Sequence, residues 1–288
     1  MALPGPSDTP QELIDEIIDH CSGDKRTLIA CSLTCKAWVH RTRKHLFSKL
    51  TLTDETLLIW CGYVETSAWK PQSLSDIYPP VPSSHPPYRL ASHVTSLQVV
   101  PKYSPNSPKS LGVVELYRAK LHLSAFTQLK SLALTAVSFA SFDSAPLEAC
   151  FGSLAETVRG LKLSMCILDE MRFFAFLRLF TRLESLEVNG NVWPSGRRAG
   201  TAKALQKDLP TLRGSFTVSG FTDSENGLLD SLVTTRVEYH TITLGHNPPL
   251  AFPKLNALFA KCKDHLRTLS LTAPERISRY SGKSSLDR

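Results

Sequence analysis

A leucine pattern that recurs every 25 to 35 residues constrains this chain more than any other feature. The pattern is L-x-x-L-x-L, with other apolar residues allowed at each leucine position, and copies begin at residues 94, 129, 158, 183, 213, 239 and 266. A weaker copy is formed by Phe47, Leu50 and Leu52. A unit this short cannot cover its own apolar edge, so successive units are expected to stack and bury that edge against one another.

Helix-like segments separate the leucine motifs, which predicts one strand and one helix in each unit. These segments cover residues 144–155, 168–180, 200–209, 224–235 and 253–265. The predicted fold class is therefore α/β, with a curved solenoid of strand–helix repeats over residues 93–274. A doubly wound nucleotide-binding sheet also alternates strands and helices, but it needs a glycine-rich turn after its first strand, which we do not find.

A helical segment precedes the repeats. Residues 10–21 carry apolar side chains at the spacing of one helical face, and Thr9 is placed to cap this helix. A second helix is predicted from about Lys25, and a basic segment follows at residues 41–47. The second helix is expected to bury a stripe formed by Leu28, Cys31, Cys35 and Trp38.

Proline marks the boundary between these two parts. Nine of the 19 prolines lie between residues 71 and 108, and proline lacks the backbone donor that a helix or central strand requires. We therefore expect an irregular Pro/Ser-rich insertion at residues 71–92. Residues 48–70 are predicted as a linking strand and helix or as a first repeat, and residues 275–288 as a weakly ordered tail.

The N-terminal segment resembles the F-box, a short three-helix module, in the spacing Pro10-x-Glu12-Leu13-x-x-x-Ile17 and Asp24-x-x-Thr27-Leu28-x-x-Cys31-x-Leu33-x-Cys35-Lys36-x-Trp38. The downstream units resemble irregular leucine-rich repeats. Substrate-recognition subunits of SCF-type ubiquitin ligases combine these two parts. The resemblance implies that residues 8–47 dock on a Skp-family linker, which joins them to a cullin, while the repeats hold an unknown target protein.

The resemblance also implies which residues contact the linker. A module of ~40 residues is too small to bury all of its apolar side chains, and the remainder usually finds a partner. Thr9 stands where the family usually has leucine, which is expected to weaken linker binding by ~1–3 kcal/mol. The alternative is a leucine-rich-repeat scaffold that binds protein without joining a ligase. The expected contact residues are Pro10, Leu13, Ile17, Leu28, Cys31, Leu33, Cys35 and Trp38.

No residue constellation predicts an enzyme, a cofactor or a metal site. Cys31 and Cys35 lack a second ligand pair at zinc-site spacing. The run Gly282-Lys283-Ser284 resembles the end of a phosphate-binding loop, but Ile277 stands where that loop needs glycine. We therefore expect a non-enzymatic protein.

The charge and composition of the chain indicate which classes of partner and which cellular compartment to expect. The chain has 33 Lys+Arg and 26 Asp+Glu, so its net charge is positive. The residues that flank the strand leucines are mostly small, however, and the charges of Lys162 and Glu187 cancel each other there. Nucleic-acid binders gather cations on one face, so no nucleic acid is expected. No apolar stretch approaches the ~20 residues of a membrane span. Seven scattered cysteines and the lack of a signal segment favour the cytoplasm or the nucleus over secretion.

The C-terminal end of the predicted solenoid has little apolar cover. Only 17 residues follow the last motif, which ends at Leu271, and three of them are sizeable apolar residues. Two hypotheses remain open at this point. Either the terminus frays on a complete protein, or the solenoid continues or a partner covers the last strand.

Limited proteolysis should cut the chain first within residues 71–92, because the repeats are predicted to form one cooperative unit. Mass spectrometry of the first fragments would locate the cut. An early cut at a single site within 129–271 that leaves two stable halves would contradict a single cooperative solenoid.

Overall fold

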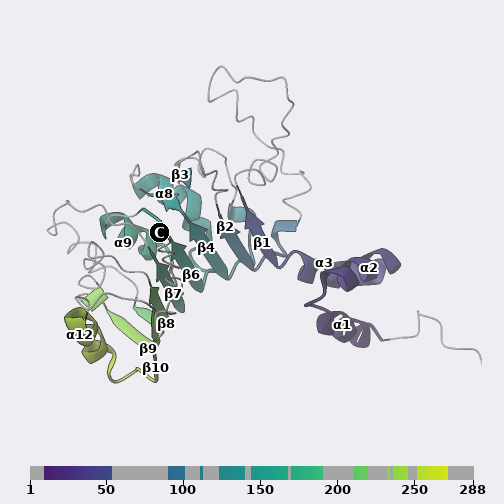
Figure 1. The fold of residues 1–288 in the computed structure, drawn as a ribbon. Coiled ribbons are helices and arrows are strands. Elements are labelled where there is room, and N and C mark those ends of the chain that lie inside the picture. The colour runs from purple at the N-terminus through teal and green to yellow at the C-terminus, as the bar shows by residue number, and fades with distance from the viewer. Residues whose placement is uncertain are drawn as a thin grey trace, which may run out of the picture.

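The computed structural model describes residues 10–53, 90–100, 111–112, 123–139, 144–167, 170–190, 211–219, 232–233, 236–245 and 252–271. These residues form a mixed α/β structure, as predicted, around an eight-stranded parallel sheet in the order β1-β2-β4-β6-β7-β8-β9-β10 (Figure 1). The strands are β1 Lys49–Leu52, β2 Ser96–Val99, β4 Ser131–Thr135, β6 Gly160–Ser164, β7 Ser185–Asn189, β8 Leu212–Ser219, β9 Val237–Leu244 and β10 Thr268–Leu271. A second sheet pairs β3 Leu111–Gly112 with β5 Val137–Ser138.

Each leucine motif supplies one strand of the large sheet, including the weaker copy at Phe47. Strand register aligns the last two apolar positions of every motif into two continuous columns. From β2 to β9 every member of both columns is at most 5% exposed. The first column is Leu50, Leu97, Leu132, Leu161, Leu186, Phe216, Ile242 and Leu269, and the second is Leu52, Val99, Leu134, Leu163, Val188, Val218, Leu244 and Leu271.

Helices cover the buried face of this sheet. α8 (Ser144–Phe151), the short 3-10 helix η2 (Gly152–Leu154), α9 (Glu170–Arg178) and α12 (Phe252–Cys262) match three of the predicted helical segments. The ring of Phe176 packs between Phe139, Phe151 and Phe180, with centroid distances of 5.0–5.2 Å. The predicted helix at 200–209, and most of that at 224–235, lie outside the described residues.

The N-terminal part forms three helices: α1 (Gln11–His20), α2 (Lys25–Thr34) and α3 (Lys36–Leu46). The predicted second helix is wrong in one respect, because Cys35 is extended (φ −148°, ψ 139°) and separates α2 from α3. Cys31 and Cys35 therefore do not share one continuous helical face, and the basic segment belongs to α3. Asp24 caps α2 by accepting hydrogen bonds from the backbone N–H groups of Arg26 and Thr27.

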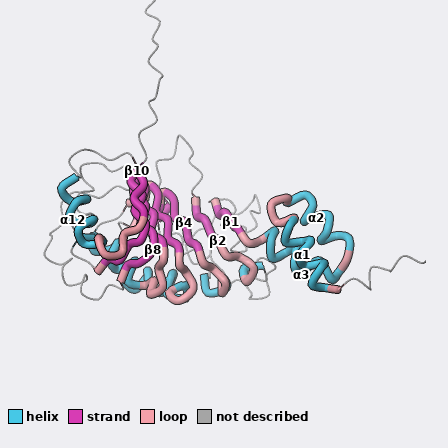
Figure 2. Tube along the Cα trace, turned by 90° about the horizontal axis from the view of Figure 1, so that it is seen from below, coloured by secondary structure: helices cyan, strands magenta, loops and turns pink. Residues whose placement is uncertain are grey.

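The chain passes from α3 directly into β1, so the helices lie beyond the β1 edge of the sheet (Figures 1 and 2). The backbone N–H groups of Thr95 and Ser96 donate to the Ser48 carbonyl oxygen at 2.8 and 2.9 Å. The rings of His40 and His93 meet edge to face at 5.6 Å. Burial, together with the neighbouring His40, lowers the pKa of His93. Ala91 is fully buried, although it lies within the range predicted as the insertion, and residues 71–89 of that range lie outside the described residues.

Two features shape the strand ends. Ala136 and Met165 adopt left-handed conformations (φ 51° and 52°) directly after β4 and β6, and their N–H groups donate to the carbonyls of Ser164 and Asn189 on the next strand. At the start of β8 the prediction is wrong by one residue: Leu212 is buried, whereas Arg213 is exposed and pairs with Glu238. The register between β8 and β9 is irregular at this point, because it shifts between Gly214 and Ser215.

The last strand is poorly covered. Leu269 and Leu271 continue the two apolar columns, but they are 46% and 71% exposed. The sequence predicted this weak cover. Residues 272–288, including the predicted tail at 275–288, lie outside the described part of the chain.

Gly214→Ala should destabilise the sheet strongly. Gly214 has φ +84°, and a Cβ added there would lie 1.8 Å from the Glu184 carbonyl oxygen. We expect a loss of about 3 kcal/mol in the free energy of unfolding, measured by urea denaturation. Gly152→Ala is the matched control, because an added Cβ there meets nothing within 4 Å. Equal effects of the two substitutions would contradict the assigned backbone of β8.

Candidate protein-binding surfaces

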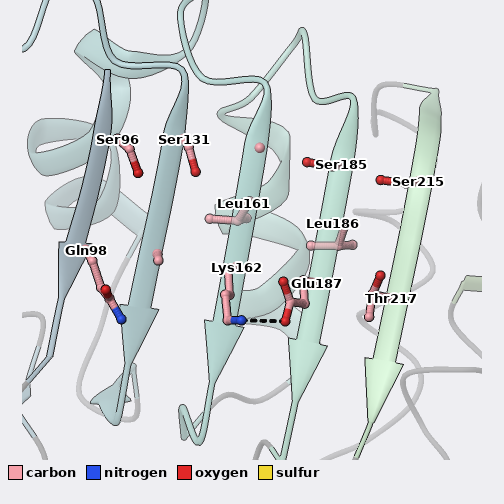
Figure 3. A pocket seen from close by; sticks show the side chains of 12 residues that line it. Ser96, Gln98, Ser131, Leu161, Lys162, Ser185, Leu186, Glu187, Ser215 and Thr217 are labelled. Atoms are coloured by element: carbon pink, nitrogen blue, oxygen red, sulfur yellow. Dashed lines mark hydrogen bonds and ion pairs between the residues drawn. The ribbon is translucent and has the colours of Figure 1, made fainter. Parts of the chain in front are cut away.

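A groove of about 350 Å³ runs across the sheet on the face opposite the helices (Figure 3). Side chains point alternately to the two faces of a strand, so the residues between the buried leucines form its floor. The sequence predicted this set of positions, and the structure confirms them for the five strands from β2 to β8. The lining residues are Ser96, Gln98, Ser131, Ala133, Gly160, Leu161, Lys162, Ser185, Leu186, Glu187, Ser215 and Thr217.

One charged network crosses the middle of this groove. The Lys162 ammonium and the Asn189 side-chain amide both donate to Glu187 Oε1, each at 2.6 Å. Ser219 Oγ in turn donates to Asn189 Oδ1 at 2.7 Å. The sequence showed that Lys162 and Glu187 cancel in charge, but it missed the contribution of Asn189 and Ser219. Their register could have revealed them, because both occupy the last position of neighbouring strands.

The rest of the floor carries polar side chains without a hydrogen-bond partner among the described residues. Within the described residues, no protein group forms a hydrogen bond with the side chains of Ser96, Gln98, Ser131, Ser185, Ser215 or Thr217. Gly160 lies between two of these serines, and a Cβ there would lie 2.9 Å from Ser185 Oγ and 3.7 Å from Ser131 Oγ. The groove therefore offers free donors and acceptors around a notch at Gly160.

A second surface lies on the three N-terminal helices, α1 to α3. Leu13 and Ile17 of α1 are 52% and 61% exposed, and Leu33 of α2 is 82% exposed. Ile29, which the sequence analysis did not select, is also half exposed. These helices therefore present large apolar side chains to solvent, where apolar groups are unfavourable without a partner.

The other predicted contact residues differ in accessibility. Pro10 and Cys35 are exposed, whereas Cys31 and Trp38 are half-buried. Leu28 is only 1% exposed and belongs to the interior of the three helices. Leu28 is therefore removed from the contact set, because a side chain that packs between helices is not accessible to a partner in this conformation.

One carboxylate ties α1 to α3. Asp19 accepts a hydrogen bond from Arg41 Nε at 2.6 Å and a second one from Arg41 Nη2, and His45 Nε2 lies 2.6 Å from the same carboxylate. The hydrogen bonds from Arg41 and His45 hold the pKa of Asp19 well below its usual range.

Two structural features and two comparisons with known proteins bear on the candidate sites. Within the described ranges, no three or more His, Cys, Asp or Glu side chains are grouped as a metal site would require. No helix in the same ranges is both long enough and apolar enough to span a bilayer. No protein-family model matches the chain, and no curated protein matches its sequence.

Acidification should loosen α1 from α3. The pKa of Asp19 is lowered in the folded chain, so its charge stabilises the fold above the unfolded pKa of about 3.9 and that stabilisation is lost as the pH falls below this value. Asp19→Asn should lower the free energy of unfolding by about 0.5–1 kcal/mol at neutral pH, because a half-exposed ion pair is screened by solvent.

The control for this prediction is Asp15→Asn, since the Asp15 carboxylate lies 4.0 Å from Arg41 and accepts no hydrogen bond from it. Urea denaturation near neutral pH and at about pH 3 should show a smaller pH dependence for Asp19→Asn than for wild type and Asp15→Asn. An unchanged pH dependence in Asp19→Asn would exclude this carboxylate as the source.

Proposed function

We propose that this protein is a substrate adaptor of an SCF-type E3 ubiquitin ligase. In this proposal α1 to α3 form an F-box-like module that docks on a Skp-family linker and through it on a cullin. The strand–helix units form a leucine-rich-repeat-like solenoid that binds a target protein. The chain itself carries no catalytic step, because the ligase chemistry belongs to other subunits.

The observation that carries the proposal is the exposure of large apolar residues on a small helical module. Leu13, Ile17, Ile29 and Leu33 lie at least half exposed within two helices of ten residues each. Complete burial of a leucine or isoleucine side chain is worth about 1.5–3 kcal/mol, so covering several of them favours docking. The F-box-like spacing of the same segment gives the partner its proposed identity.

The repeats support the second half of the proposal. Each unit adds one parallel strand next to the preceding one, and the order of the strands along the chain is kept across all eight strands of the large sheet. Stacked units of this kind present a long surface made of equivalent positions, which suits recognition of an extended partner. The groove between β2 and β8 is the corresponding surface here.

The alternative is a repeat scaffold that binds protein without joining a ligase. The groove favours this alternative as much as the adaptor, because every residue that lines it belongs to β2, β4, β6, β7 or β8 and none belongs to the helices. A measurement of binding to the linker therefore distinguishes the adaptor from the scaffold.

Titration of the intact chain with a purified Skp-family linker should show binding with a dissociation constant below about 10 μM. Ile17→Asp and Leu33→Asp should each weaken it at least about tenfold, because each places a charge in an apolar contact. Met165→Asp is the matched control, since Met165 is also half exposed but lies next to the sheet.

The titration has two informative negative outcomes. No binding by the intact chain at tens of micromolar would remove the ligase proposal and leave the scaffold. Equal loss of binding in Met165→Asp would show that the apolar surface of α1 and α2 is not the docking site. Affinity purification followed by mass spectrometry should recover linker and cullin subunits together with the chain.

A further inference from the structure

The charged network in the groove has a donor group and an acceptor atom that its own hydrogen bonds leave available to a ligand. The Lys162 ammonium has three donors and uses one of them for Glu187. Both hydrogen bonds to Glu187 end on Oε1, and no donor from the described residues reaches Oε2. The two side chains are 44% and 34% exposed. A ligand in the groove can therefore contact a free cationic donor and a free anionic acceptor.

The order of these two charges along the groove is fixed. Register places Lys162 of β6 opposite Glu187 of β7. Asn189 holds the Glu187 carboxylate, and Ser219 holds Asn189. Figure 3 shows the two charged groups meeting over the floor, with the cation over β6 and the anion over β7. A bound ligand thus meets a positive group and then a negative group at set positions.

The surroundings fit the main chain of a peptide. The unused hydroxyl groups of Ser131, Ser185 and Ser215 line the row that precedes the charges. The large apolar residues that line the floor, Leu161 and Leu186, are only 2% exposed, and Ala133 offers a single methyl group, so an apolar anchor has little to contact. The absence of a Cβ at Gly160 lets a backbone approach the sheet closely.

We propose that the groove binds an extended peptide segment of the target that carries one acidic and one basic side chain, two residues apart. The acidic side chain contacts Lys162 and the basic side chain contacts Glu187. Residues i and i+2 of an extended chain lie on one face at about 6.6 Å, whereas residues i and i+1 point in opposite directions. This inference rests on the proposed function only in assigning the segment to the target protein.

A nucleic acid fits the same groove less well. Phosphates attract clustered cations, but here each phosphate near Lys162 would also lie near the Glu187 carboxylate. The pair is neutral as a unit, so it selects a ligand of mixed charge over one of uniform charge. We therefore assign the groove to a mixed-charge peptide.

The test uses the full chain and four fluorescent nonapeptides that share a Ser/Ala/Thr host sequence. Their central residues are Glu-x-Lys, Lys-x-Glu, Glu-x-Glu or Lys-x-Lys. The wild-type chain should bind one of the two mixed-charge peptides roughly tenfold more tightly than the other three, because two half-exposed charge contacts are gained together. Fluorescence anisotropy reports the affinity.

The exchange variant Lys162→Glu/Glu187→Lys should reverse the preferred charge order, since it keeps an ion pair but inverts its direction. The matched control is Arg159→Glu/Glu184→Arg, which exchanges the pair at the start of the same two strands and outside the groove lining. This control should keep the wild-type preference. Lys162→Gln/Glu187→Gln should remove the preference, and it serves as the test if the exchange variant does not fold.

Equal binding of the four peptides by the wild-type chain would overturn the inference, as would an order preference that the exchange leaves unchanged. Displacement of the preferred peptide by a single-stranded oligonucleotide at equal concentration would assign the groove to nucleic acid instead. The linker titration is independent of these measurements. Its failure removes the ligase proposal alone, and loss of the order preference removes only this inference.

Discussion

The alignment of leucine columns across the parallel sheet is the constraint on which the rest of this structure depends. Each strand delivers two apolar side chains to one face at the same register, and they are nearly inaccessible from β2 to β9. A shift of one residue would move these side chains to the solvent face. Gly214 has a positive φ, and the register between β8 and β9 shifts next to it, yet Phe216 and Val218 keep their places in the two columns. The sheet thus tolerates an irregular register at the start of one strand but keeps its buried columns.

The same register creates the groove. Because apolar residues occupy one face of each strand, the residues between them share the other face at equivalent positions. In most units the residues at these positions are small, and the hydroxyl groups among them have no hydrogen-bond partner within the described part of the chain. Lys162 and Glu187 occupy one equivalent position in neighbouring units, so their side chains meet as a consequence of the repeat.

The N-terminal helices have only a small buried interior, in contrast to the sheet. Few of their large apolar side chains are buried, and Leu28 and Ile18 form the small interior. Polar contacts supplement this interior, since Asp19 joins α1 to Arg41 and His45 of α3. The exposed side chains of Leu13, Ile17 and Leu33 remain available for a partner. A module with a small core and an apolar surface suits docking better than independent stability.

The sequence by itself determined the α/β class, the approximate positions of the strands of the large sheet and the flanking residues that form most of the groove floor. The repeat fixes which side chains are buried, and strand alternation places the residues between them on the other face. It also located α1 and the start of α2. It could not show that Cys35 ends α2, since the apolar spacing of Leu28, Cys31, Cys35 and Trp38 fits one longer helix. Only the tertiary structure decided that Leu28 is buried while Leu33 is exposed, and that Glu187 binds Lys162 and Asn189. These outcomes depend on how helices pack and on which strands become neighbours, and local periodicity carries no information about either.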